Sequence, residues 1–141
     1  MNFSATTEYA LRIMSYMALD NTKLYTTNEL FDKLNIPFRY LRKQMLFLQK
    51  KGLLVSVQGK QGGYQIARSL DEVSLMDIIN ATDPIEIENK CFFGFQSCPL
   101  TNTCSMHNRW GEIRDKTIDM LTNTTLNDLR SENNPLLLSL K

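Results

Sequence analysis

The sequence predicts a mainly helical fold that contains one small β-hairpin and ends in a long helix. Two patterns lead to this prediction. Apolar residues recur at helical spacing in several segments, and a glycine-rich turn separates two short runs typical of strands. The chain of 141 residues is 43% hydrophobic, which is enough to bury one core. We therefore expect one domain with an appended helical element.

The first expected helix covers residues 4–19 and carries its apolar side chains along one stripe. That stripe consists of Tyr9, Ala10, Ile13, Met14, Met17 and Ala18. Ser4 is suited to cap the N-terminus, and Glu8 lies near the positive end of the helix dipole. A polar break at residues 20–22 ends this helix.

A second and a third helix follow in close succession. Thr26 and Glu29 have the spacing of a capping box, Asn35 suits a left-handed helix end, and Pro37 suits the first turn of the next helix. The apolar residues are Leu30, Phe31 and Leu34 in the second helix and Phe38, Leu41, Met45 and Leu48 in the third. Two short helices joined by a tight turn predict a helix-turn-helix.

The third helix, which stops at Gly52, begins with polar and basic side chains on its other side. These are Arg39, Tyr40, Arg42, Lys43 and Gln44. In a helix-turn-helix, the N-terminal residues of the second helix enter the major groove of DNA. We therefore expect DNA contacts from Arg39, Tyr40, Arg42 and Lys43.

Two strand-like runs, residues 53–57 and 64–67, follow directly and are separated by the glycine-rich turn 58–63. A basic hairpin at this position is typical of the wing in a winged helix-turn-helix. The backbone amides of such a turn and its lysine can reach phosphates or the minor groove beside the helix. The expected wing contacts are Gln58, Gly59, Lys60 and Gly62.

The charge of the chain is nearly balanced overall but strongly divided along the sequence. The formal net charge is +1, yet residues 33–70 contain no Asp or Glu at all. The basic residues in this window are Lys33, Arg39, Arg42, Lys43, Lys50, Lys51, Lys60 and Arg68. Such a field suits a phosphate backbone, an acidic protein or an anionic lipid surface. The charge alone leaves the partner open, and the helix and hairpin pattern favours duplex DNA.

All three cysteines and the only histidine of the chain lie close together. Cys91, Cys98, Cys104 and His107 form the pattern Cys-x6-Cys-x5-Cys-x2-His. A short helix over residues 74–81 precedes a loop over residues 82–103. A long helix begins near Ser105, with an apolar stripe made of Met106, Trp110, Ile113, Thr117 and Leu121. Cys104 therefore lies at a helix start, where a thiol is more readily deprotonated to the metal-binding thiolate.

This cysteine pattern allows several interpretations. Its spacing is longer than the gaps of zinc ribbons, which favours an iron–sulfur cluster over structural zinc. Three phenylalanines between the first two cysteines, Phe92, Phe93 and Phe95, can shield a cluster or belong to a core. A disulfide-forming thiol switch and unrelated buried thiols are the alternatives. A Cys104–His107 nucleophile is weaker, since no orienting carboxylate or oxyanion site is evident nearby.

Several stretches together resemble the Rrf-two (Rrf2) family of bacterial winged-helix regulators, which has IscR-like and NsrR-like branches. They are Thr7-Glu8-Tyr9-Ala10-Leu11-Arg12, Gly52-Leu53-Leu54, Gly59-Lys60-Gln61-Gly62-Gly63-Tyr64, the three-cysteine loop and Thr125-Leu126-Asn127-Asp128-Leu129. The resemblance implies a homodimeric transcription factor whose long C-terminal helix pairs with a second copy. It also implies an iron–sulfur cluster, held by Cys91, Cys98 and Cys104, whose state changes the affinity for the operator.

The resemblance leaves the fourth cluster ligand open between two residues. In the IscR-like branch it is a histidine placed like His107, on a two-iron cluster. In the NsrR-like branch it is a carboxylate at the position of Glu8, donated by the other subunit to a four-iron cluster. Cys104-Ser105-Met106-His107 resembles the first branch, whereas the late segment 126–138 resembles the second. The histidine is slightly favoured because it requires no geometry between subunits.

These observations together predict the organisation and the class of the protein. We expect a DNA-binding domain over residues 1–81, a cysteine-rich loop over 82–104 and a dimerisation helix with a tail over 105–141. Without an apolar run of membrane-spanning length or a secretory signal, the chain is expected to be cytoplasmic and not membrane-bound. We expect a regulator rather than an enzyme. The alternatives are a cluster-free thiol-switch regulator, a thiol enzyme and a protein-interaction module.

Overall fold

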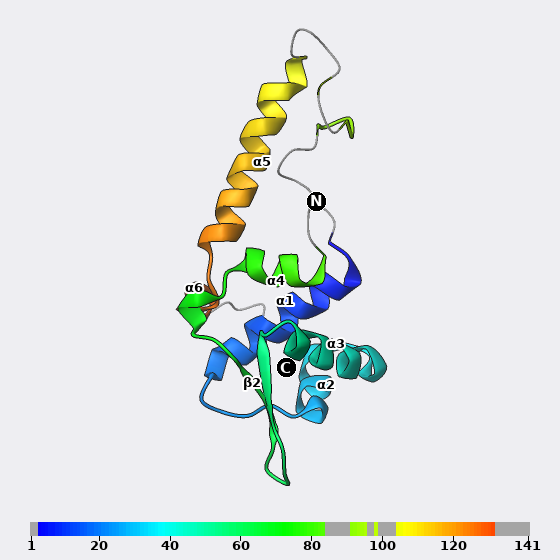
Figure 1. Ribbon diagram of the computed structural model, residues 1–141, viewed down its shortest axis with the longest axis vertical. Coiled ribbons are helices and arrows are strands. Elements are labelled where there is room, and N and C mark those ends of the chain that lie inside the picture. The colour runs from blue at the N-terminus through cyan, green and yellow to red at the C-terminus, as the bar shows by residue number, and fades with distance from the viewer. Residues whose placement is uncertain (1–2, 84–90, 96–97, 99–103, 132–141) are drawn as a thin grey trace.

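The computed structural model describes residues 3–83, 91–95, 98 and 104–131 of the chain. It confirms a mainly helical fold with one antiparallel hairpin (Figure 1). The elements in chain order are α1 (Ala5–Met17), η1 (Ala18–Asp20), α2 (Thr27–Leu34), α3 (Phe38–Lys50), β1 (Leu54–Val57), β2 (Gly63–Ile66), η2 (Leu70–Glu72), α4 (Leu75–Thr82), α5 (Ser105–Asn123) and α6 (Leu126–Ser131).

The helix ends follow the capping residues that the sequence indicates. Ser4 accepts a hydrogen bond from the Thr7 amide, and Asn35 ends α2 in the left-handed region with φ of 51°. Thr26 caps α2 by accepting from the Glu29 amide at 3.1 Å. The Glu29 carboxylate pairs with Lys23 instead of returning to the cap, so the predicted capping box is formed in one direction only.

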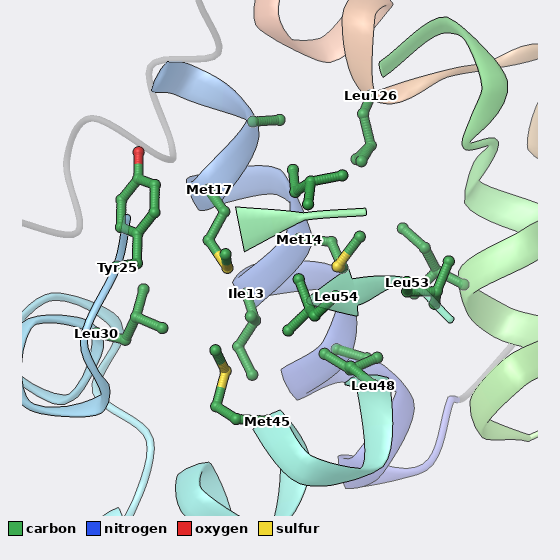
Figure 2. Packing of buried hydrophobic residues seen from close by; sticks show 14 of the residues in the cluster. Ile13, Met14, Met17, Tyr25, Leu30, Met45, Leu48, Leu53, Leu54 and Leu126 are labelled. Carbon is green, nitrogen blue, oxygen red and sulfur yellow. The ribbon is translucent and has the colours of Figure 1, made fainter. Parts of the chain in front are cut away.

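Helix α1 contributes to the centre of the core, and α2, α3, β1 and α6 pack against this helix (Figure 2). The fully buried side chains come from every one of these elements. They include Ile13, Met14, Met17, Leu30, Leu34, Leu41, Met45, Leu48, Leu54 and Leu126. Burial of a leucine-sized side chain contributes about 2 kcal/mol, which makes this cluster the main source of stability.

Two phenylalanines of the predicted apolar stripes point out of the core. Phe31 is 43% exposed and Phe38 is 37% exposed. Leu30 and Leu34 of α2 and Leu41 of α3 are fully buried instead. The sequence prediction that Phe38 shares one apolar side of its helix with Leu41 is therefore wrong.

The hairpin is held in place by its glycines and by a contact to the chain before α2. β1 pairs with β2 from Leu54 opposite Ile66 to Val57 opposite Gly63. The backbone of Tyr25 also exchanges two hydrogen bonds with Tyr64, at 2.9 and 2.8 Å. A Cβ at Gly63 would lie 2.8 Å from the Tyr25 carbonyl oxygen, so only glycine fits there.

Tyr25 anchors this junction with its side chain as well. It is 3% exposed, and its hydroxyl donates to the Asp20 carbonyl at 2.9 Å. Burial, together with the nearby Asp20 carboxylate, raises the pKa of Tyr25 to about 12.

The last part of the described chain returns to the core. The Leu75 amide donates to Thr124 and the Leu126 amide donates to Val73, each at 2.9 Å, so the end of α5 is tied to the start of α4. Leu126 is fully buried against the residues around α1. In Figure 1, α5 runs from this anchor toward one end of the long axis, while the hairpin occupies the other end. Within the described ranges, no helix has the length and apolar character needed to cross a membrane.

Candidate nucleic-acid interface and cysteine segment

Helix α3 has one buried face and one exposed cationic face. Leu41, Met45 and Leu48 are fully buried, and they fix the helix against the core. The predicted contact residues Arg39, Tyr40, Arg42 and Lys43 are all exposed. Because α3 follows α2 after a tight turn, its exposed first turns have the position of a recognition helix.

The basic side chains of this surface are not neutralised by acids. The ion pairs within the described ranges are Lys23–Glu29 and Arg114–Asp115, and neither involves α3 or the hairpin. Tyr40 packs its ring 6.3 Å from that of Tyr9 on α1 while remaining 59% exposed. The surface thus offers uncompensated positive charge, which favours binding of a polyanion.

Gln44 does not lie with the other polar residues of α3. It is only 6% exposed, and its side-chain amide donates to the Thr6 carbonyl at 3.0 Å. The helical spacing that groups Gln44 with the polar side ignores this partner on α1. Gln44 therefore joins α3 to the start of α1 and is not available to contact DNA.

The hairpin places its polar tip beyond the strands. Gln58, Gly59 and Lys60 are exposed. Gly59 has φ of 114°, and the Gly62 amide donates to the Gly59 carbonyl at 3.1 Å. A Cβ on Gly62 would lie 2.0 Å from the Val57 carbonyl oxygen, so this residue shapes the turn. Lys60 is the cation that the tip presents.

The hairpin and α3 are connected directly. The Gln49 side-chain amide donates to the Ser56 hydroxyl at 3.0 Å. This bond joins the last turns of α3 to β1, so the hairpin is attached directly to the helix that carries the exposed cationic face.

The three cysteines lie in three separately described pieces of chain, residues 91–95, 98 and 104–131. Cys91 and Cys104 are half-buried, Cys98 is exposed, and all three are free thiols. Cys91 opens a tight turn in which its amide donates to the Phe95 carbonyl at 3.0 Å. The ring of Phe92 packs 5.7 Å from that of Trp110, which holds this turn against α5.

Cys104 lies at the start of α5, as the sequence predicts; its side chain makes no capping bond, and the His107 amide donates to its carbonyl. His107 and Glu8 are both exposed, on α5 and on the first turn of α1. Among the residues that the structure describes, no three His, Cys, Asp or Glu side chains are grouped closely enough to hold a metal ion. The soft donor chemistry fits a thiolate-bound centre, but the described geometry does not assemble one.

A hydrogen-bonded chain connects the end of α4 to α3. The hydroxyls of Thr82 and Thr7 lie 2.9 Å apart, and Thr7 is fully buried. The neighbouring Thr6 carbonyl accepts from Gln44 of α3. A groove of about 820 Å³, lined in part by Thr6, Gln44 and Thr82, borders this chain. Because Thr82 ends α4 just before the loop that carries the cysteines, we call these residues the loop-to-helix link.

Curated relatives resemble this chain over nearly its whole length. A transcriptional regulator of helix-turn-helix type from Aquifex aeolicus is 32% identical over 92% of this chain and 91% of its own length. The regulator IscR of Pectobacterium atrosepticum is 28% identical over 92% of this chain and 79% of its own. Both are transcriptional regulators and not enzymes, which confirms that expectation.

Solved structures share the fold. The global cysteine regulator CymR of Bacillus subtilis superposes with a TM-score of 0.78 at 24% identity, covering 94% of this chain and 98% of its own. The oxidised form of Staphylococcus aureus CymR gives 0.70 at 27% identity, covering 92% and 96%. The family model described as an iron-dependent transcriptional regulator, Rrf2, matches residues 3–132. The chain, with its exposed cationic helix and hairpin, therefore belongs to the Rrf2 family of transcriptional regulators.

Proposed function

We propose that the chain is a homodimeric regulator that binds duplex DNA through α3 and the β1–β2 wing. The main observation in support is that α3 has a buried apolar face and an exposed face with Arg39, Arg42 and Lys43. The side chains of these three residues and Tyr40 contact bases and phosphates in the major groove. Lys60 and the free amides of the wing tip hold the adjacent backbone.

The homodimer in this proposal follows from the exposed apolar residues of α5. Ile113 is 59% exposed and Met120 is 55% exposed, and Leu121 is the buried residue of this helix. Pairing of two α5 helices covers these side chains. A two-fold dimer then presents two copies of α3 to half-sites about 34 Å apart on a roughly palindromic operator.

The first experiment measures affinity for a duplex selected from a randomised pool, as a function of salt. Arg42→Ala is expected to weaken binding roughly tenfold or more and to reduce the salt slope by about 1, because one phosphate or base contact is lost. Arg130→Ala, which removes an exposed cation of α6 outside α3, the wing and α5, is the matched control and leaves both quantities unchanged. Equal behaviour of the two variants would contradict the proposed surface.

We further propose that the cysteine segment controls this binding through one of two chemistries. In the first, Cys91, Cys98 and Cys104 hold an iron–sulfur cluster, with His107 or the Glu8 of a second copy as the fourth ligand. The cluster would be two-iron with His107 or four-iron with Glu8, and it supplies a redox- and nitric-oxide-sensitive centre. The similarity to IscR and the occurrence of all three thiols in one short stretch support this chemistry.

In the second chemistry, two of the thiols form a disulfide and pass two electrons to a peroxide oxidant. The cysteines, which are free and at least partly exposed, support this alternative. So does the likeness to the oxidised form of Staphylococcus aureus CymR, which is 27% identical.

Anaerobic purification separates these two chemistries. Coloured protein with stoichiometric iron and sulfide supports the cluster, and colourless protein with a peroxide-induced disulfide supports the switch. Operator affinity is then compared between the two states of the same protein at one salt concentration. A change of about 5- to 150-fold is expected from ordinary allosteric coupling, and equal affinities would contradict control by the cysteines.

A further inference from the structure

Two exposed aromatic side chains form a pair at the turn between α2 and α3. The rings of Phe31 and Phe38 lie 5.5 Å apart and are nearly perpendicular, at 87°. Edge-to-face contacts of this kind hold two rings in a defined orientation. The pair lies outside the buried core, to which the same two helices contribute Leu30, Leu34 and Leu41.

The position of this pair relates it to the cationic face of α3. Phe38 is the first residue of α3, and the exposed Arg39 and Arg42 follow it within the first two turns. In a helix-turn-helix, this end of the second helix is the part that enters the major groove. Cationic side chains fix the register by binding phosphates, so an apolar ring among them lies close to the base edges.

The chemistry of phenylalanine restricts what it can recognise there. Its ring carries no hydrogen-bond donor or acceptor for the polar edges of the bases. The C5-methyl group of thymine is the apolar group that the base pairs expose in the major groove, and phenylalanine is one of the side chains that contact it. A thymine methyl is therefore the ligand that matches this ring.

We propose that Phe38, positioned by Phe31, contacts a thymine C5-methyl group in each half-site and thereby makes the operator specific for thymine at that position. The proposal rests on the proposed function, because it assigns a base preference to the same DNA-binding surface. Phe38 is the contacting residue, and Phe31 is a positioning residue that orients its ring.

The test replaces each thymine of a pool-selected duplex by uracil, which removes only the methyl group. With the full-length protein, uracil at one position of a single half-site is expected to weaken binding about fourfold, the factor expected for burial of one methyl-sized group. With Phe38→Ala the same substitution is expected to have no effect. Phe31→Ala is expected to reduce the uracil effect while leaving the salt slope unchanged.

Leu46→Ala is the matched control, because Leu46 is 56% exposed on the same helix but lies more than two turns beyond Phe38. This variant is expected to retain the full uracil effect. Phe38→Leu keeps an apolar side chain at this position and is expected to retain part of the uracil effect. This variant keeps the test decisive if Phe38→Ala does not fold. Duplex binding that is indifferent to uracil at every position would overturn the inference alone. The absence of duplex binding would overturn the proposed function as well.

Discussion

The molecule has two regions that differ sharply in how they bury their apolar residues. The body, residues 3–83 with α6, encloses a core in which α1, α2, α3 and β1 contribute fully buried side chains. The arm consists of residues 91–95, 98 and 104–123. In the arm, the side chains of Phe93, Ile113 and Met120 are each more than half exposed. The buried residue of α5 is Leu121. The body therefore encloses most of its apolar residues, whereas the arm leaves apolar surface exposed.

The comparison separates two kinds of sequence signal. In the body, apolar spacing coincides with burial except at Phe31 and Phe38, because each stripe meets another element of the same chain. In α5 the stripe with Trp110 and Ile113 has the same spacing, but only Leu121 reaches the interior. Apolar periodicity therefore predicts a helix in both regions. It predicts that the apolar side is buried within the same chain only in the body.

The largest expected effect sets Leu126 in the body against Ile113 in the arm. Leu126→Ala removes a fully buried side chain and is expected to cost about 2–5 kcal/mol of unfolding free energy. Ile113→Ala changes a residue that is 59% exposed and is expected to cost less than about 0.5 kcal/mol within one chain. It is expected to weaken dimerisation instead. Urea unfolding measures the loss of unfolding free energy, and sedimentation at several protein concentrations measures dimerisation. Equal losses of unfolding free energy in the two variants would contradict the difference between the body and the arm.

The second prediction compares two glycines. Gly62→Ala forces a Cβ to within 2.0 Å of the Val57 carbonyl and is expected to distort the wing and cost about 1–3 kcal/mol. Gly111→Ala in α5 meets no atom closer than 3.8 Å and is expected to stabilise the helix by about 0.5–1 kcal/mol. Thermal unfolding measures both, and stabilisation by Gly62→Ala would refute the tight turn.

The third prediction uses Tyr25 as a probe of the body alone. Because its pKa in the folded state is about 12 instead of 10.0, folding favours the protonated phenol. This contribution is fully present below pH 10 and is lost as the pH rises from 10 to 12, with an upper limit of about 3 kcal/mol. Stability measured against pH is expected to fall in this window, and Tyr25→Phe is expected to remove most of that fall.

The smallest expected effect concerns the loop-to-helix link between the regions. Thr82→Val removes the hydroxyl that contacts Thr7 and is expected to cost about 0.5–1.5 kcal/mol. It is also expected to reduce the difference in DNA affinity between the two states of the cysteines. Thr117→Val, which removes a hydroxyl bonded within α5, is the control and keeps that difference. An unchanged difference in Thr82→Val would exclude this route of coupling.

Much of the body could be predicted from local patterns because its helix ends depend on short-range chemistry. Ser4, Thr26 and Asn35 act where the sequence places them, and the glycine-rich turn forms the hairpin. The outward orientation of Phe38 was missed, because apolar spacing does not show which of the spaced side chains the core encloses. The inward orientation of Gln44 was missed for a related reason, since its partner Thr6 lies far away in sequence.

The residues of the cysteine segment could be predicted from the sequence, but their positions relative to one another could not. Spacing identifies Cys91, Cys98, Cys104 and His107 as a group, and the position of Cys104 at the start of α5 is confirmed. Short-range patterns do not determine how separate loop residues approach one another, and the fourth ligand stays a prediction. Nothing in the spacing indicated that Phe92 would hold the Cys91 turn against Trp110.

The attachment of α5 at one end has a mechanical consequence. The helix has 19 residues and is therefore about 28 Å long, with Leu121 held in the body and Cys104 at the distant tip. A rotation of about 10° at the attached end would displace that tip by about 5 Å, a distance comparable to one helical turn. Conversely, a displacement of a few ångströms at the Cys104 end of α5 would rotate the helix by only a few degrees where it meets α4.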